Sequence, residues 1–184
     1  MKVVHFVSVV DPRKCNGDRL CEGLCPAGAI KVVEKKARVD ATRCVACGKC
    51  ADVCREEAVT LIRRDDPMAI GFNVAAVDPA KVQELCMKAS LLPDLLVCAC
   101  TGTLAGEVAA AVISGARSPE DIVARTGAGS GCGIYCMGVV FKLFQAAGIR
   151  IPEDPRWNNL PLTAADVPEV VSEKYPAYYF RGRI

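Results

Sequence analysis

The sequence predicts an α+β protein: a small cysteine-rich domain of strands and short helices, then a small all-α domain, then an extended C-terminal tail. Three observations support this fold class. One cysteine pattern occurs twice near the start of the chain, at an offset of 29 residues, and a β-branched run follows each copy. Three segments with helix start and stop signals lie between residues 103 and 147. Prolines and aromatic residues are frequent in the last 34 residues.

The repeated pattern contains the residue types that hold iron–sulfur clusters. Its two copies are Cys15, Asp18, Cys21, Cys25 and Cys44, Cys47, Cys50, Cys54. Three thiolates separated by two residues each can surround one cubane cluster, and a fourth cysteine, which follows after three intervening residues, ligates the other cluster in two-cluster proteins. The β-branched runs at residues 29–33 and 58–62 are expected to be matching strands, and residues 3–10 a first strand.

This duplication resembles the bacterial two-cluster ferredoxins, and the resemblance covers residues 1–66. The resemblance implies two sites that exchange a ligand between the copies. Site 1 would consist of Cys15, Asp18, Cys21 and Cys54. Site 2 would hold a 4Fe-4S cluster and consist of Cys44, Cys47, Cys50 and Cys25.

Asp18 stands where that family usually has cysteine. A carboxylate oxygen is a harder and weaker ligand for iron than a thiolate. Site 1 is therefore predicted to be a 4Fe-4S cluster with Asp18 bound, or a 3Fe-4S cluster that lacks this corner. The alternative is that Asp18 is a solvated residue of the turn that begins at Asn16, since Asp favours turns.

Residues 67–93 are expected to connect the two domains. The acidic pair Asp65 and Asp66 predicts a solvated turn that closes the first domain. A helix should begin after Asp78, which can cap it, with Pro79 at its first position. Cys86 lies on the apolar stripe of this helix and is interpreted as a small buried hydrophobic residue.

A third cysteine group lies in residues 94–150, which form the predicted all-α domain. Site 3 would consist of Cys98, Cys100, Cys132 and Cys136. Helices are expected at residues 103–115, from Ser118 onward, and at residues 133–147. The glycine-rich loop between the last two would direct backbone N–H groups at an anionic, thiolate-bound cluster.

These residues resemble the helical domain of bacterioferritin-associated ferredoxin, notably at residues 115–122 and 126–133. The resemblance implies a 2Fe-2S cluster. The family ends its site in Cys-x-x-Cys, whereas three residues separate Cys132 from Cys136 here. Because of this altered spacing, 4Fe-4S is slightly preferred over 2Fe-2S. A structural zinc ion is the alternative, since four thiolates also suit a closed tetrahedral site.

The tail at residues 151–184 holds half of the aromatic side chains of the chain. A segment interrupted by prolines cannot bury these side chains within itself. The residues concerned are Trp157, Tyr178, Tyr179 and Phe180. We expect the tail to pack on a partner protein, with packing on its own domains as the alternative.

Several classes of protein are disfavoured by the sequence. The first ten residues lack the features of a secretory leader, and no apolar run is long enough to span a bilayer. With twelve cysteines, a soluble protein of a reducing, anaerobic cytoplasm is expected. The only histidine, His5, lies in the first predicted strand, so no active site is evident. Charges are balanced, which argues against nucleic acid as a partner.

Together these features predict an electron-transfer subunit that serves a partner oxidoreductase. The combination of dicluster domain, helical cluster domain and aromatic tail is similar to the electron-transfer subunit of the class II benzoyl-CoA reductases of obligate anaerobes. This resemblance implies a tungsten-pterin subunit as the larger partner and ferredoxin-type proteins as electron donors or acceptors. An iron–sulfur redox sensor and a metal-delivery protein are the alternatives.

Overall fold

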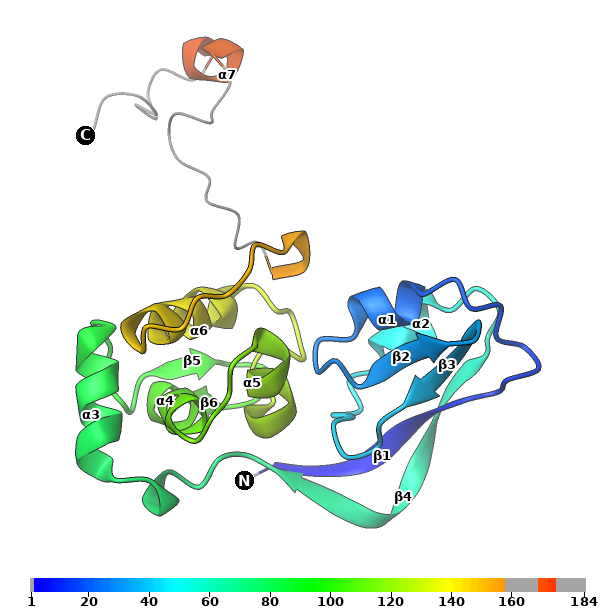
Figure 1. Cartoon of the computed structure of the whole chain (residues 1–184), viewed down its shortest axis with the longest axis horizontal. Helices are drawn as coiled ribbons and strands as arrows, with labels where there is room; N and C mark the ends of the chain where they lie inside the picture. Colours follow the sequence, from blue (N-terminus) through cyan, green and yellow to red (C-terminus); the bar gives the residue numbers. More distant parts are fainter. Residues whose placement is uncertain (1, 158–168, 175–184) are drawn as a thin grey trace. The chain divides into compact units, whose positions relative to one another are not determined.

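The computed structural model describes residues 2–157 and 169–174 (Figure 1). Residues Met1–Ile151 form one compact unit and Pro152–Ile184 a second. The second unit contains the short helices η2 (Pro155–Trp157) and α7 (Glu169–Lys174). The expected aromatic contacts of Tyr178, Tyr179 and Phe180 lie outside the described residues. The finer division into domains ending at residues 66, 93 and 150 stays a prediction.

The first half of the large unit consists of two antiparallel strand pairs and two short helices. Strand β1 (Lys2–Val10) pairs with β4 (Val59–Ile70), and β2 (Ile30–Val33) pairs with β3 (Lys36–Val39). Helices α1 (Leu20–Leu24) and α2 (Lys49–Val53) follow the two cysteine loops. The predicted α+β class is confirmed, and the three expected strands are present.

The internal repeat is visible in the backbone as well as in the sequence. Three pairs of residues with a left-handed backbone conformation are separated by 29 positions: Gly17 with Ala46, Arg19 with Gly48, and Gly28 with Glu57. The two copies therefore fold their cysteine loops in the same way, although only some of these positions carry glycine, the residue that adopts this conformation without strain.

The expected turn at Asp65 and Asp66 is wrong, because both residues belong to β4. This strand continues to Ile70, which pairs with Lys2 at the start of β1. The register shifts between the pairs Val4 with Met68 and Phe6 with Arg63, so β4 carries extra residues there. Such a bulge lets the strand accommodate Pro67, which has no N–H group for the ladder.

The second half is helical apart from one short hairpin. After η1 (Val74–Ala76) and α3 (Pro79–Lys88), strands β5 (Leu96–Cys98) and β6 (Thr103–Leu104) pair antiparallel. Helices α4 (Ala105–Ile113), α5 (Pro119–Thr126) and α6 (Tyr135–Ala146) follow. All four helices were expected, and the side chains of Asp78 and Ser118 cap α3 and α5 as predicted.

Helix α4 forms the centre of this half. It packs against α3, α5 and α6 (Figure 1). Its residues from Val108 to Val112 are almost completely buried, and three of them are alanines. Small side chains on every face allow neighbouring helices to approach closely, so a short helix can be surrounded. Cys86 of α3 is completely buried, as its place on the apolar stripe predicted.

Two groups of polar contacts join the two halves of this unit. The ammonium of Lys2 donates to Thr103 Oγ1 at 3.0 Å, to Glu107 Oε1 at 2.9 Å and to the Thr126 carbonyl at 2.7 Å. The guanidinium of Arg43 donates to Asp121 Oδ1 of α5 at 3.2 Å. The first strand and a cysteine loop are thereby attached to the helical half.

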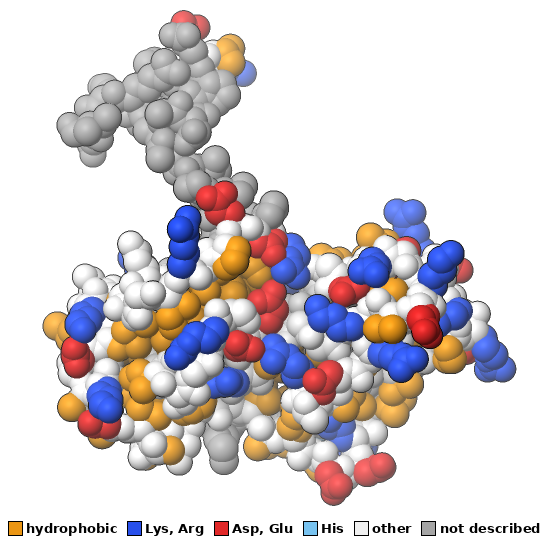
Figure 2. Space-filling view, viewed as in Figure 1, with side chains coloured by type: hydrophobic (Ala, Val, Ile, Leu, Met, Phe, Trp, Pro, Cys, Tyr) orange, Lys and Arg blue, Asp and Glu red, His pale blue; other side chains and the backbone are white. Residues whose placement is uncertain are grey.

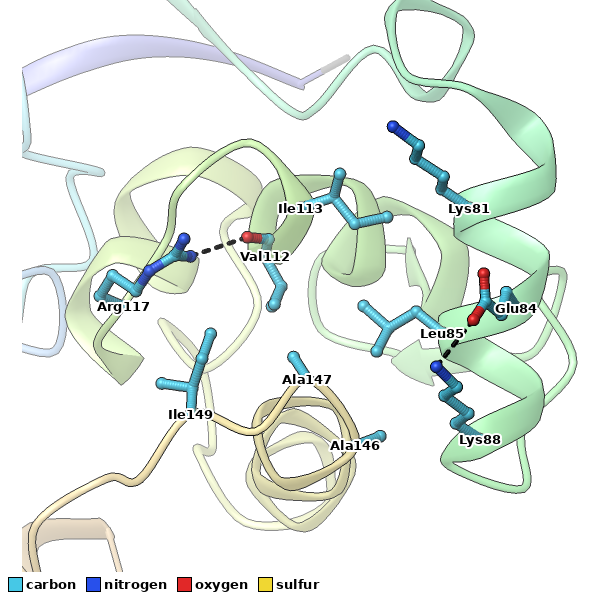
Figure 3. Close-up of a pocket in the computed structure, with 10 residues that line it drawn as sticks. All are labelled: Lys81, Glu84, Leu85, Lys88, Val112, Ile113, Arg117, Ala146, Ala147 and Ile149. Carbon is cyan, nitrogen blue, oxygen red and sulfur yellow. Dashed lines mark hydrogen bonds and ion pairs between the residues drawn. The ribbon is translucent and has the colours of Figure 1, made fainter.

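The surface carries charges of both signs, interspersed over the face shown in Figure 2. A groove of about 340 Å³ opens between α3, α4 and α6 (Figure 3). Its floor includes Leu85, Val112 and Ile149, and Lys88 at its edge pairs with Glu84. No cysteine lines this groove, so the cysteine sites lie elsewhere.

Candidate iron–sulfur sites

The four predicted ligands of site 2 line one cavity. Cys25, Cys44, Cys47 and Cys50 line a small cavity of about 10 Å³, and apolar residues such as Ala27 and Ile30 complete the walls. Three of these cysteines are buried, and Cys47 is half-buried. Four thiols that converge on an apolar cavity are the donor set that a 4Fe-4S cluster requires. The residues of site 2 therefore fit the predicted cluster.

Burial and mutual repulsion govern the ionisation of these thiols. Burial raises the pKa of Cys47 and of Cys50, and neighbouring cysteine charges, including that of Cys25, raise both further. A bound cluster would favour the deprotonated form instead, because iron binds the thiolate and the thiol proton is released. The backbone N–H of Ala29 donates to Cys25 Sγ at 3.2 Å, which stabilises the thiolate form.

Ser8 is a site residue that the sequence did not indicate. It belongs to β1, is 3% exposed, and also lines the site 2 cavity. Its Oγ lies 3.1 Å from Cys50 Sγ and 3.8 Å from Cys44 Sγ. The one available signal was a serine inside an otherwise apolar run of a strand next to the cluster motif.

Site 1 is less enclosed. After burial, the charges of Cys15, Cys50 and Asp18 contribute to raising the pKa of Cys21, so these groups lie near one another. The backbone N–H of Ala37 donates to Cys15 Sγ at 3.4 Å.

Cys54, the remaining predicted cysteine of site 1, follows α2. The backbone N–H of Ala58 donates to Cys54 Sγ at 3.3 Å, which repeats the contact made at Cys25. The Asn16 side chain donates to Glu56 Oε1 at 3.3 Å, which ties the Cys54 loop to the loop of Cys15.

Asp18 itself is exposed, and its Oδ1 accepts the N–H of Leu20 at 3.1 Å. This hydrogen bond supports the first turn of α1 and leaves the second carboxylate oxygen available. Asp18 therefore serves the local turn, and its role as an iron ligand stays a prediction.

Site 3 is built from two pairs of cysteines. Cys100 and Cys132 are exposed, and their sulfurs lie 3.7 Å apart. Cys98 and Cys136 are buried and interact with each other. The Cys100 pair depends on a close approach by the glycine loop, because a Cβ at Gly131 would lie 2.7 Å from Cys100 Cβ.

The two pairs provide thiols of different acidity. Burial and the charge of Cys98 raise the pKa of Cys136 to about 12. For Cys98, burial is outweighed by hydrogen bonds from the Thr101 hydroxyl and from the N–H of Gly129, so its pKa is lowered. At Cys132 the N–H of Ile134 is the main cause of a lowered pKa. The loop and the start of α6 thus direct backbone donors at sulfur, as expected.

Other metal chemistry has less support from the geometry. Within the described residues, no three His, Cys, Asp or Glu side chains stand close enough together to hold a single metal ion. Zinc at site 3 therefore remains an alternative from the sequence alone. None of the twelve cysteines forms a disulfide.

Comparison with known proteins assigns both cysteine regions to iron–sulfur families. Residues 8–55 match the 4Fe-4S dicluster domain, and residues 96–146 match the BFD-like [2Fe-2S] binding domain. Both halves thus contain iron–sulfur domains. The second match supports a 2Fe-2S cluster at site 3, and the expected preference for 4Fe-4S stays a prediction.

Two curated proteins are similar to short parts of the chain. One is a component of the ion-translocating oxidoreductase complex of Methanosarcina acetivorans, with 47% identity over 26% of this chain and 18% of that protein. The other is an uncharacterised protein of Methanocaldococcus jannaschii, with 41% identity over 30% of this chain and 21% of that protein.

The chain thus spans about a fifth of the length of these relatives. No solved structure matches it significantly. Among the described residues, no helix combines the length and apolar character needed to cross a membrane. The domain matches and the first relative support an iron–sulfur electron-transfer role.

Proposed function

We propose that this chain is the electron-transfer subunit of a larger oxidoreductase complex, and that it passes low-potential electrons through three clusters to or from a catalytic partner. The observation that carries this proposal is the cavity of site 2, where four cysteines from two copies of the motif converge. Clusters at these sites would supply reversible one-electron storage. The chain itself supplies thiolate ligands, hydrogen bonds to their sulfurs and apolar walls.

The contacts of Arg43 support an order of the sites along the electron path. Arg43 directly precedes Cys44 of site 2, and its guanidinium donates to the Ala27 carbonyl at 3.0 Å and to Asp121 of α5. Helix α5 leads directly into the glycine loop of site 3. Site 2 is therefore attached to the helical half, which supports the order site 1, site 2, site 3.

The exposed side chains around site 3 favour this site as the point where electrons pass between the chain and its catalytic partner. Its Cys100 and Cys132 are exposed, and so are two residues of the segment that follows Cys132, Ile134 at 67% and Tyr135 at 85%. Apolar and aromatic side chains beside an exposed cluster are suited to a protein partner, since interface centres are enriched in such residues.

The partner that we propose is a tungsten-pterin subunit, because the chain resembles the electron-transfer subunit of the class II benzoyl-CoA reductases and this resemblance implies such a partner. The first relative is also named as part of an oxidoreductase complex, which supports a role inside an assembly. A reducing, anaerobic cytoplasm suits twelve cysteines without a disulfide. Ferredoxin-type proteins would serve as donors or acceptors at the other end of the path.

The test is metal analysis and EPR of the chain purified without oxygen. We expect about ten irons if site 3 is 2Fe-2S and about twelve if it is 4Fe-4S, by the iron content of each cluster type. The reduced clusters should pass electrons to oxidised methyl viologen without loss of iron. Eight irons with one zinc, or clusters that disassemble on each redox cycle, would contradict the conduit and favour metal delivery or sensing.

A further inference from the structure

We propose that the hydroxyl of Ser8 raises the reduction potential of the site 2 cluster and thereby separates it from that of site 1. This inference rests on the proposed function, because it requires clusters at both sites. Ser8 is not a predicted ligand of the cluster, and it would change the reduction potential through its contact with a ligand sulfur.

The geometry of Ser8 dedicates its hydroxyl to sulfur. The side chain is 3% exposed, and its Oγ lies 3.1 Å from Cys50 Sγ and 3.8 Å from Cys44 Sγ. The other buried hydroxyl residues, Thr103 and Thr126, bond to oxygen or nitrogen atoms of the chain instead. A buried hydroxyl requires a partner, and the partners of Ser8 are the two ligand sulfurs.

The internal repeat provides a natural comparison within the same molecule. The 29-residue offset that relates the cysteine motifs places Ala37 at the position equivalent to Ser8. Ala37 is 7% exposed, lies in β3, and donates its backbone N–H to Cys15 Sγ of site 1 at 3.4 Å. The alanine side chain is a methyl group, which cannot donate a hydrogen bond to sulfur. The repeat therefore has a serine whose hydroxyl contacts sulfurs of site 2, and at the equivalent position an alanine that offers site 1 no hydroxyl.

Other hydrogen bonds to sulfur are shared by the two copies. Ala29 donates to Cys25 at 3.2 Å, and Ala58 donates to Cys54 at 3.3 Å, again at an offset of 29 residues. Since these contacts match, they affect both clusters similarly. When Cys50 is a thiolate, the hydroxyl of Ser8 would be the donor of their contact, and the symmetry of the fold does not require such a side-chain donor.

The direction of the effect follows from charge. A reduced cluster carries one more negative charge than an oxidised cluster, and part of it resides on the thiolate sulfurs. A hydrogen bond to these sulfurs stabilises the reduced state more than the oxidised state, so the potential rises. Loss of one such bond should lower the ratio of reduced to oxidised cluster about tenfold at a fixed solution potential, which is 59 mV for a one-electron couple.

The experiment is an EPR-monitored redox titration of the reconstituted full chain and three variants. Ser8→Ala should lower the potential of site 2 and leave site 1 unchanged. Ser8→Thr, which keeps the hydroxyl, should restore most of the shift. Ala37→Ser introduces a hydroxyl at the equivalent position and should raise the potential of site 1. Comparison with an Asp18→Cys background identifies the signal of site 1.

The outcomes separate this inference from the proposed function. If the unaltered chain fails to bind iron, the proposed function fails. If Ser8→Ala binds full iron and both potentials stay within 10 mV or so of the unaltered chain, far below the 59 mV of a tenfold change, the tuning role of Ser8 is overturned. If Ser8→Ala does not fold, Ala37→Ser decides, because an unchanged potential at site 1 would overturn the argument from the repeat.

Discussion

Gly131 offers a direct test of the geometry of site 3. In the substitution Gly131→Ala, the new Cβ would lie 2.7 Å from Cys100 Cβ and 2.9 Å from Cys100 Sγ. Ordinary Cβ contacts begin near 3.4 Å, so Cys100 would have to withdraw by about 0.7 Å, the difference from 2.7 Å. This movement disturbs the pair with Cys132, whose sulfur now lies 3.7 Å from that of Cys100.

Overpacking of this kind destabilises a site by about 1–3 kcal/mol. A loss of that size corresponds to roughly 5–150-fold weaker retention of the third cluster. The first two sites lie in the other half of the unit and should keep their iron. The assay is the iron and sulfide content of the reconstituted chain after gel filtration, together with the visible absorbance of its clusters.

Gly138→Ala is the matched control. Gly138 lies in α6, and a Cβ there meets nothing within 4 Å. Alanine is favoured over glycine in a helix by up to about 1 kcal/mol, so this variant should be neutral or more stable. Full loading of site 3 in Gly131→Ala, equal to that of Gly138→Ala, would refute the assignment of Cys100 as a ligand held by the loop.

Three further substitutions or modifications test the remaining assignments. In the cluster-free chain the N–H of Ile134 is the main cause of a lowered pKa at Cys132, whereas burial raises the pKa of Cys136 to about 12. Iodoacetamide at about pH 8 should therefore alkylate Cys132 before Cys136. Equal alkylation rates of the two cysteines, measured by peptide mass spectrometry, would argue against these environments. Cys86→Ala should leave the iron content unchanged and lower stability by about 1 kcal/mol, since the residue is fully buried; a loss of iron would make Cys86 a ligand. Asp18→Ala should convert site 1 to 3Fe-4S, seen as a new EPR signal of the oxidised chain, and an unchanged spectrum would remove Asp18 from the ligand set.

The cysteines could be grouped into candidate sites from the sequence because their spacing is a local property. The three predicted ligands of site 2 that belong to one motif, Cys44, Cys47 and Cys50, follow one another at intervals of three positions. Cys25 was assigned to the same site because, in two-cluster ferredoxins, the fourth cysteine of each motif ligates the other cluster. The helices were also predictable, because Asp78 and Ser118 cap them and apolar stripes follow. These signals act within a few residues of the structure that they determine.

Features that depend on distant contacts or unusual turns were missed. Strand β3 was not expected, because the turn before it uses Glu34 and Lys35, both with left-handed backbones, where Asn-Gly is the usual signal. Ser8 lies 42 positions from Cys50, and Arg43 lies 78 positions from Asp121. No sequence periodicity or motif indicates that the two residues of such a pair lie close together in the fold. The strand at Asp65 and Asp66 was misread because pairing with β1 overrides the local preference for a turn.

The different burial of the sites gives the hydrogen bond of Ser8 a role in the electron path. Three of the predicted ligands of site 2 are buried among apolar walls, whereas two of the predicted ligands of site 3 are exposed. An apolar shell disfavours added negative charge, so burial alone would lower the potential of site 2 relative to a hydrated cluster. If site 2 stands between sites 1 and 3, a very low potential there would slow transfer in both directions. A hydroxyl against Cys50 opposes this effect, and its removal in Ser8→Ala should slow electron flow through the chain even when every cluster is present.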